Sequence, residues 1–320
     1  MLRAALLGCG AIGAGSGEPH PELGVMTHAG AYVACPDTEL VAVCDADGER
    51  ARACAERWGG RAYTDPLALL AEQGPELVSV ATPDGTHGEL VESALRAGAR
   101  AVLAEKPLAL SVAEAAALVE LALERGAVLA VNYTRRFVPV FRALAADTTL
   151  GTLQHVSGVY VKGLKHNGTH WLDLLRLLAG EPVDVRGWDR LGDGGADPTL
   201  DAELTLANGA GARLAGLDTN RFTAFEMDLW FTEARIHVAE GGHVLERWDV
   251  GADPRNPGYR VLLPRPVQRG ALRDGVLHAV QDVVGCLRDG REPACTGADG
   301  VRALALADAI RASAGLPCTP

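Results

Sequence analysis

Several features that mark particular protein classes are absent from this sequence. No apolar run reaches the ~18 residues that a membrane-spanning helix needs, so no such helix is expected. The seven cysteines are odd in number and form no CxxC pair, which argues against a disulfide framework and a structural zinc site. The longest basic cluster is Arg135-Arg136 in a chain of net charge -11, so neither nucleic acid nor a membrane is expected as a partner.

The N-terminal segment has too short an apolar run for a secretory signal. The run before Cys9 extends only from Ala4 to Leu7, whereas signal peptides carry ~7–15 apolar residues. Cys9 and Cys44 lie in apolar surroundings and are interpreted as small buried hydrophobic residues. These features are typical of the reducing cytoplasm, where we expect the protein to work.

The length of 320 residues suits two domains of ~150 residues each. The first ~130 residues alternate short apolar runs with amphipathic stretches, a pattern typical of βα units and a parallel sheet covered on both faces. Ser111, followed three residues later by Glu114, predicts a capped helix start. The expected strands are Leu2–Leu7, Glu39–Cys44, Glu76–Ala81, Arg100–Ala104 and Ala127–Val131, and the expected helices are Gly48–Trp58, His87–Ala97 and Val112–Glu124.

The rest of the chain has a different pattern. Short alternating segments are separated by turn signals such as Asn208-Gly209 and Gly241-Gly242, which predicts a mostly antiparallel sheet. We therefore expect an α/β Rossmann domain over residues 1–134 and an α+β domain over residues 135–320. The second domain's expected strands are Val183–Trp188, Thr199–Leu206, Ala212–Asp218, Phe225–Phe231 and Arg235–Val238, and its helices are Val138–Ala146, His170–Leu178, Asp274–Leu287 and Asp299–Ala314.

A G-x-G-x-x-G motif follows the first predicted strand, which is the context that gives this motif its value. Gly8 permits the tight turn, Gly10 lets the backbone approach a pyrophosphate, and Gly13 allows close packing of helix on strand. The start of the following helix offers free N–H groups to the phosphates. The predicted cofactor contacts here are Gly8, Cys9, Gly10, Ala11, Ile12 and Gly13.

Asp45 closes the second predicted strand and is placed to accept hydrogen bonds from the ribose hydroxyls. Its charge would repel a 2′-phosphate, which favours NAD over NADP, although Arg50 and Arg52 are near enough to reach in. The acidic residue usually lies ~20 residues beyond the glycines, but Asp45 lies 32 beyond Gly13. Residues 14–28 therefore look like an insertion, either a surface loop or a flap near the cofactor.

Two further clusters follow strand ends, where an α/β dinucleotide site takes its side chains. One spans Ala81–His87 and contributes Thr82, Pro83 and His87 as predicted cofactor contacts. The other is Glu105-Lys106-Pro107, whose first two residues are predicted to meet the cofactor as well. A lysine straight after a buried strand suggests a function for its amine.

With these motifs the sequence resembles the glucose–fructose oxidoreductase/inositol dehydrogenase family (Gfo/Idh/MocA). The segments GCGAIG, ATPDGTH, AEKPLA, VNYTRRF and GTHWLDLLRLL occur in that family's order and spacing. The resemblance implies a Rossmann domain, an open-faced sheet domain through which a homodimer or homotetramer forms, and an NAD-dependent oxidoreductase of sugars, inositols or nucleotide sugars. It also implies that Lys106 and His170 are the catalytic pair.

The chemistry of alcohol oxidation is consistent with those roles. A hydride leaves carbon for the nicotinamide, and a proton leaves oxygen for an acceptor within hydrogen-bond reach. An ammonium at Lys106 can polarise the oxygen. His170, because imidazole ordinarily titrates near pH ~6.5, suits the proton shuttle. Asp173, one helical turn on, is as consistent with orienting the imidazole as with a structural role.

The chain departs from the family pattern at His166, where many members carry aspartate four residues before the histidine. Two histidines at i and i+4 can bind zinc, but the glutamate of H-E-x-x-H is missing, so no metal is expected. Lys162 and Lys165 could bind an anionic substrate group or form a solvated pair. The predicted substrate contacts are Lys106, Asn132, Tyr133, Arg136, His166, Asn167 and His170.

Two other functions stay open at this point. One is an enzyme that keeps NAD bound and cleaves glycosidic bonds without net redox change, as some relatives of the family do. The other is a dinucleotide-sensing regulatory protein, because fold alone does not fix function.

Overall fold

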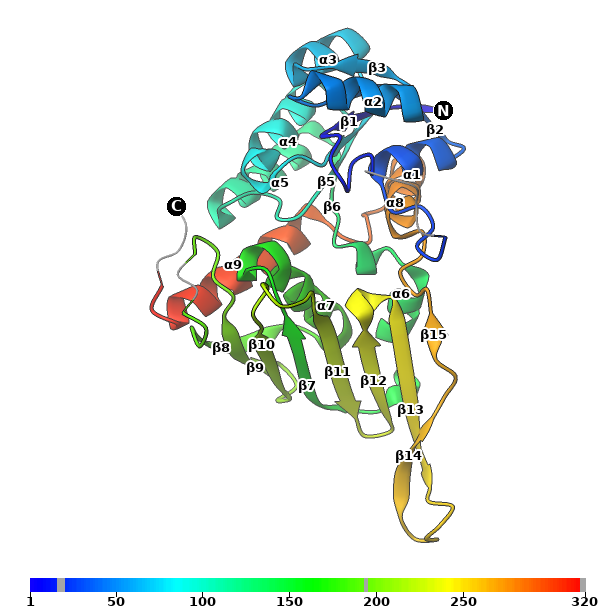
Figure 1. Cartoon of the computed structure of the whole chain (residues 1–320), viewed down its shortest axis with the longest axis vertical. Coiled ribbons are helices and arrows are strands. Elements are labelled where there is room, and N and C mark those ends of the chain that lie inside the picture. Colours follow the sequence, from blue (N-terminus) through cyan, green and yellow to red (C-terminus); the bar gives the residue numbers. More distant parts are fainter. Residues whose placement is uncertain (16–20, 193–194, 317–320) are drawn as a thin grey trace. The chain divides into compact units, whose positions relative to one another are not determined.

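Two units, each with its own β-sheet, make up residues 1–15, 21–192 and 195–316, the part of the chain described by this computed structural model (Figure 1). The first unit comprises Met1–Val138 and Arg273–Leu304; the second comprises Pro139–Leu272 and the residues from Ala305 on. The predicted division after residue 134 differs from this in two respects, the first being that residues 135–138 belong to the first unit. The second is that residues 273–304, expected in the second domain, pack with the first.

The first unit has a parallel sheet of six strands in the order β3-β2-β1-β4-β5-β6. This is the strand order of Rossmann domains, with β1 and β4 adjacent where the order reverses. The inner strands β4 and β5 are buried along their whole length, as expected for a sheet covered on both faces. The strands are β1 Leu2–Leu7, β2 Thr38–Cys44, β3 Arg61–Tyr63, β4 Leu77–Val80, β5 Ala101–Ala104 and β6 Val128–Val131.

Helices cover the two faces of this sheet in two groups (Figure 1). Helix α1 packs against α2 and α8, and α4 packs against α3 and α5. The predicted capping residue Ser111 accepts a hydrogen bond from the amide of Glu114 at 3.3 Å. The helices are α1 His28–Ala34, α2 Gly48–Trp58, α3 Pro66–Gln73, α4 His87–Arg96, α5 Val112–Arg125 and α8 Gly275–Asp289.

The helix after the glycine motif is interrupted in sequence but continuous in its hydrogen bonds. The amide of Gly15 donates to the carbonyl of Ala11, four residues earlier, at 3.1 Å. The next carbonyl, that of Ile12, accepts from the amide of His28, also at 3.1 Å. The run of hydrogen bonds therefore passes from Gly15 directly to His28, although residues 16–27 separate the two in sequence.

This continuity explains the unusual spacing of Asp45. Removing residues 16–27, twelve in number, from the 32 that separate Asp45 from Gly13 leaves 20, the ordinary distance in dinucleotide-binding folds. The predicted insertion over residues 14–28 is thus too long at both ends, because Ala14 and Gly15 belong to the turn after the glycines and His28 begins α1. Residues 16–20 of that insertion lie outside the described residues.

The second unit has a nine-stranded sheet in the order β14-β13-β12-β11-β7-β10-β9-β8, with β15 paired to β13. All its pairs are antiparallel except β7 with β10. The predicted Asn208-Gly209 hairpin joins β9 and β10. The strands are β7 Leu153–Tyr160, β8 Pro182–Trp188, β9 Asp201–Leu206, β10 Gly211–Gly216, β11 Phe225–Phe231, β12 Ala234–Ala239, β13 Val244–Ala252, β14 Arg260–Pro264 and β15 Gln268–Arg269.

Alternate residues of this sheet face a core and an open side. On β11, Met227 and Leu229 are buried, whereas Glu226 and Trp230 are exposed. Helix α7, Thr169–Ala179, places the fully buried Trp171 in the core. The other helices are α6 Pro139–Ala145 and α9 Gly297–Ser313, whose last residues belong to this unit. Within the described ranges, no helix combines the length and apolarity needed to cross a bilayer.

Candidate active site

The carboxyl ends of the parallel strands bring together the residues predicted in the first unit. Because these ends lie at one edge of a sheet, the loops after β1, β2, β4, β5 and β6 are neighbours. The polar groups that they place at this edge are Asp45, Thr82, Glu105, Lys106 and Asn132.

The glycines of the motif differ in what an added Cβ would meet. Gly8 has φ +98°, and a Cβ there would collide with the carbonyl of Ala81, so the turn requires glycine. A Cβ on Gly13 would collide with the carbonyl of Gly8 in the same way. A Cβ on Gly10 would meet no atom within 4 Å, so its backbone faces open space. That open backbone is where a pyrophosphate would approach, which fits a dinucleotide.

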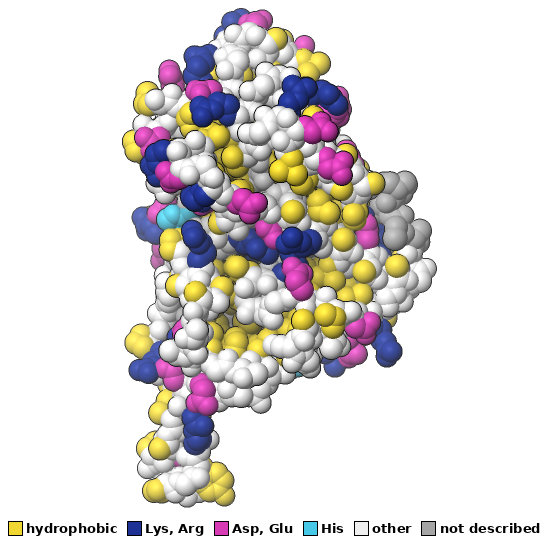
Figure 2. Space-filling view, turned by 180° about the vertical axis from the view of Figure 1, so that it is seen from behind, with side chains coloured by type: hydrophobic (Ala, Val, Ile, Leu, Met, Phe, Trp, Pro, Cys, Tyr) yellow, Lys and Arg dark blue, Asp and Glu magenta, His cyan; other side chains and the backbone are white. Residues whose placement is uncertain are grey.

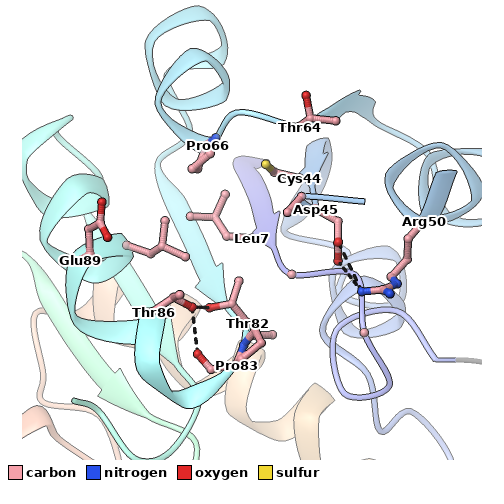
Figure 3. A pocket seen from close by; sticks show the side chains of 15 residues that line it. Leu7, Cys44, Asp45, Arg50, Thr64, Pro66, Thr82, Pro83, Thr86 and Glu89 are labelled. Carbon is pink, nitrogen blue, oxygen red and sulfur yellow. Dashed lines mark hydrogen bonds and ion pairs between the residues drawn. The ribbon is translucent and has the colours of Figure 1, made fainter. Parts of the chain in front are cut away.

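A cavity of about 630 Å³ opens beside this turn (Figure 3). Its wall combines the glycine turn, the end of β2 and the loop after β4. Such a volume is within the ordinary range for small-molecule sites. The lining residues are Leu7, Gly8, Gly10, Cys44, Asp45, Ala46, Arg50, Thr64, Pro66, Ala81, Thr82, Pro83, Thr86, Glu89 and Leu90.

Asp45 is held in a fixed orientation at the cavity wall. Its Oδ2 accepts from the amide of Cys9 at 2.9 Å, and its Oδ1 accepts from the amide of Asp47 at 2.9 Å. Arg50 reaches the same carboxylate, with Nη1 3.4 Å from both oxygens (Figure 3). Arg50, which the sequence places near enough to reach this site, therefore contacts the Asp45 carboxylate that is expected to bind the ribose hydroxyls.

Glu105 is buried and bonded within the protein. Its Oε1 accepts from Nδ2 of Asn132 at 2.6 Å and lies 3.0 Å from Nε2 of His28. Burial by itself would raise the pKa of Glu105, but the hydrogen bonds from His28 and Asn132 and the charge of Lys106 hold it below its usual value. Glu105 is therefore an ionised carboxylate directly before the half-buried Lys106.

Other predicted contacts of the first unit are also buried. Both ring nitrogens of His87 lie at backbone carbonyls, and its exposure is 1%. Tyr133 is buried, and Arg136 is nearly so, with Nη1 3.5 Å from Oδ1 of Asp299. Whether these side chains touch a ligand stays a prediction; their burial shows that they support this edge of the sheet.

In the second unit the predicted residues follow β7 in a short π-helical turn, Leu164–Gly168, which leads into α7. Such turns often occur at functional sites. Asp197 anchors the turn, because its two carboxylate oxygens accept from the amides of Lys165 and His166, both at 2.8 Å. His166 is exposed and His170 is half-buried. The expected α-helical i, i+4 pairing of the two histidines is therefore altered by the wider turn.

Two other side chains of this segment have internal partners. Lys165 is buried, and its Nζ lies 2.8 Å from Oδ1 of Asp308, so the predicted solvated pair with Lys162 is wrong for Lys165. Asn167 donates from Nδ2 to the carbonyl of Val161 at 2.9 Å. The segment is thus held in place by several internal contacts, while the side chain of His166 stays exposed to solvent.

Sequence reasoning missed two residues that bear on the site. His28 was placed in an insertion, yet it begins α1 and contacts Glu105. Its local signal is Thr27, which accepts from the amide of Gly30 as a helix cap. Asp197 had no signal, because it acts on a segment 31 residues away in sequence. No group of three or more His, Cys, Asp or Glu side chains suited to a metal ion occurs among the described residues.

Comparison with known proteins agrees with this geometry. The family model for oxidoreductases with an NAD-binding Rossmann fold, GFO_IDH_MocA, matches residues 2–133. UDP-N-acetylglucosamine 3-dehydrogenase of Acidithiobacillus ferrooxidans is 31% identical over 297 residues, which cover 89% of this chain and 92% of the relative. An inositol 2-dehydrogenase of Rubrobacter xylanophilus is 31% identical over 87% of this chain and 84% of its own.

The fold is shared over the same length. The solved structure of the A. ferrooxidans UDP-N-acetylglucosamine 3-dehydrogenase superimposes with a TM-score of 0.78 at 28% identity, covering 98% of this chain and 97% of that chain. The sequence-based expectations of the fold class and of an oxidoreductase are confirmed. The chain belongs to the Gfo/Idh/MocA family of oxidoreductases, whose first domain is an NAD-binding Rossmann fold.

Proposed function

We propose that this oxidoreductase transfers a hydride between NAD and a ring carbon that bears a hydroxyl or keto group, in a sugar, an inositol or a nucleotide sugar. The observation that carries the proposal is the single edge of the first sheet. It has an open glycine backbone, an oriented carboxylate at Asp45, and Lys106. The relatives named above act on a nucleotide sugar and on an inositol, which share a ring hydroxyl as the reacting group.

In this proposal NAD supplies the hydride acceptor, and the protein supplies orientation and proton transfer. The ammonium of Lys106 binds the reacting oxygen and stabilises the charge that develops on it. His170 takes the hydroxyl proton as the hydride leaves carbon, and returns it in the reverse reaction. His166 contributes a further polar contact to the substrate in the place of an acidic residue.

NAD is the proposed cofactor in preference to NADP. The Asp45 carboxylate is fixed by two backbone amides and is ready to accept from ribose hydroxyls. A 2′-phosphate would lie against that charge, although Arg50 would offset part of the repulsion. A thermal-shift titration tests this, because a ligand that binds only the folded protein raises its apparent stability. NAD(H) should raise the midpoint more than NADP(H) at equal concentration.

The substrate class is tested by incubating the protein and NAD with a panel of sugars, inositols and nucleotide sugars. Accumulation of NADH with a ketone product supports the proposal. Cleavage of a glycoside without NADH would instead support the redox-neutral enzyme. Tight NAD binding with no turnover of any panel member, in either direction, would support a sensing role and contradict the proposal.

A homodimer or homotetramer through the second sheet is also proposed, in the cytoplasm. The open face of that sheet has Arg235 stacked between two aromatic rings, 4.6 Å from the centre of Trp230 and 4.5 Å from that of Trp248. Arginine and tryptophan are enriched at the centres of interfaces.

The six cysteines in the described residues are free and buried, which suits a reducing compartment.

The hairpin of β13 and β14 adds an apolar arm to this surface. Figure 2 shows hydrophobic side chains along the arm where it extends beyond the rest of its sheet. Tyr259 is 65% exposed, and Leu263 and Val267 are also exposed. Light scattering should give a dimer or tetramer mass, and Arg235→Glu with Tyr259→Ser should lower it. A monomeric mass for the unaltered protein would contradict this part of the proposal.

A further inference from the structure

Two buried histidines lie on either side of Lys106 in the first unit. His28 begins α1 and is 0% exposed; His87 begins α4 and is 1% exposed. His28 contacts the residue before Lys106, and His87 contacts the residue after it. Neither histidine takes part in the reaction steps proposed above.

His28 is the centre of a chain of hydrogen bonds that ends at Glu105. Its Nδ1 lies 2.8 Å from Oγ of Ser79, and that Oγ lies 2.6 Å from the hydroxyl of Tyr32. If Tyr32 donates to Ser79, Ser79 donates to Nδ1, and Nε2–H donates to Glu105, every proton meets an acceptor. This arrangement needs only a neutral imidazole, and its donors all point toward the carboxylate.

Glu105 is consequently fixed from two directions. Asn132 donates to the same Oε1 from the end of β6, at 2.6 Å. A buried carboxylate with two donors has little freedom to rotate, because losing either bond leaves an unsatisfied buried group. The backbone that leads into Lys106 is fixed with it.

His87 holds the other side of the lysine. Its Nδ1 lies 2.6 Å from the carbonyl oxygen of Pro107, and its Nε2 lies 2.7 Å from that of Thr82. Carbonyl oxygens only accept, so the imidazole ring is the hydrogen-bond donor on this side of the lysine. Through this ring the residue after Lys106 is joined to the loop that lines the dinucleotide cavity.

We propose that His28 and His87 are positioning residues, which set the Lys106 amine in its reactive place and tie it to the cofactor loops. The inference rests on the proposed function, in which Lys106 binds the reacting oxygen. Displacements of about 1 Å at a reacting group can reduce a rate about 10²-fold. By preventing such a displacement of the Lys106 amine, the two histidines affect the reaction rate without contacting the substrate.

The kinetic test compares His28→Leu and His28→Gln with the unaltered enzyme, using NAD and whichever panel substrate is turned over. Leucine removes both hydrogen bonds, whereas the glutamine amide can still donate to Glu105. We expect kcat to fall about 10- to 100-fold in His28→Leu and to recover largely in His28→Gln, with KM for NAD changed less than about threefold. His87→Leu should behave like His28→Leu, with His87→Gln between it and the unaltered enzyme.

A matched control is His278→Gln. His278 is a half-buried histidine of α8 in the same unit, and no side-chain hydrogen bond from it to the described residues is found. It should leave kcat unchanged. If kcat in His28→Leu equals that of the unaltered enzyme, or if the glutamine variant recovers folding stability but not kcat, the positioning role is wrong.

A second measurement needs no substrate. The chain has only three lysines, Lys106, Lys162 and Lys165, so reductive ¹³C-methylation gives few NMR signals, and Lys106→Arg assigns one. The Lys106 signal should move in His28→Leu and His87→Leu and stay in place in His278→Gln. An unmoved Lys106 signal would overturn the inference. Absence of turnover with a moved signal would count against the proposed function alone.

Discussion

The two units hold their candidate residues in opposite ways. At the edge of the first sheet, His87, Glu105 and Asn132 are buried and bonded to fixed partners. In the second unit, His166 is exposed on the π-helical turn that Asp197 anchors, and His170 is half-buried in the first turn of α7. A cofactor that is the same in every turnover suits a fixed edge, whereas substrates that differ among relatives suit side chains that can be exchanged on an anchored backbone.

This difference predicts that substitutions at the two places fail in different ways. A change at the fixed edge should affect turnover or cofactor binding with any substrate. A change on the accessible segment should affect some substrates more than others, because the backbone below it is held by Asp197 and by the Lys165–Asp308 pair.

The largest effect is expected for Lys106→Ala. Loss of the ammonium that stabilises the developing oxyanion should reduce kcat/KM about 10³-fold for every substrate, a much larger change than the one in NAD affinity. Steady-state kinetics and an NAD titration measure the two quantities. Lys106→Arg keeps the charge but changes its shape, so its loss should be smaller. Near-full turnover in the alanine variant would remove Lys106 from the mechanism.

His170→Ala should reduce kcat about 10²-fold or more, because general acid–base catalysis contributes about that much. The pH–rate profile should also lose the limb that reports imidazole titration. His166→Ala, on the π-helical turn directly before α7, is the matched control, and its effect should be within about tenfold and should vary with the substrate. If kcat fell more in His166→Ala than in His170→Ala, His166 would be the proton shuttle and His170 the substrate contact.

Asp45→Ser should weaken NAD binding about tenfold, because charged hydrogen bonds to the ribose are lost, and should improve NADP binding as the repulsion disappears. Arg50 would then be freer to meet a 2′-phosphate, since only Asp47 would remain of its two carboxylate partners, Asp45 and Asp47. Adding Arg50→Ala to the first change should abolish the gain for NADP. Calorimetric titration of both cofactors measures the effect; unchanged preference would contradict the role of Asp45.

The smallest effect is expected for Gly10→Ala. This variant separates an effect on cofactor binding from an effect on folding. Its Cβ meets no protein atom, so the melting temperature should stay within about 2 °C, while NAD affinity falls about fivefold or more, which is about 1 kcal/mol. Gly8→Ala is the contrasting variant. It forces a positive φ and a collision with Ala81, so it should lose stability by about 1–3 kcal/mol. Equal effects of the two variants on stability would contradict this account.

Much of the fold could be predicted because its elements have local signals. The strands β1 and β11 and the helix α2 have the predicted bounds, since apolar periodicity and caps are properties of nearby residues. The strand β3 has three residues and α3 has eight, too few for periodicity to show. The strands β7, β13, β14 and β15 were missed because exposed or half-buried residues dilute their alternation.

The candidate site could be predicted only where its residues are motif-like. The glycines, Asp45 and Lys106 follow strand ends and are found from sequence. The contacts that hold the lysine segment in place could not be found from sequence. His28 contacts Ser79 and Glu105, which lie 51 and 77 residues away from it along the chain. Lys165 was likewise interpreted as solvated, since nothing near it in sequence indicates the carboxylate of Asp308.

The passage of helical hydrogen bonds from Gly15 to His28 has a consequence for protein engineering. The amides of Gly15 and His28 bond to the consecutive carbonyls of Ala11 and Ile12, so the two ends of the intervening segment are held at neighbouring positions. Loop-closure entropy grows slowly with length, by about 0.6 kcal/mol for each doubling. A peptide tag or a reporter domain could therefore be inserted into this segment at little cost to folding.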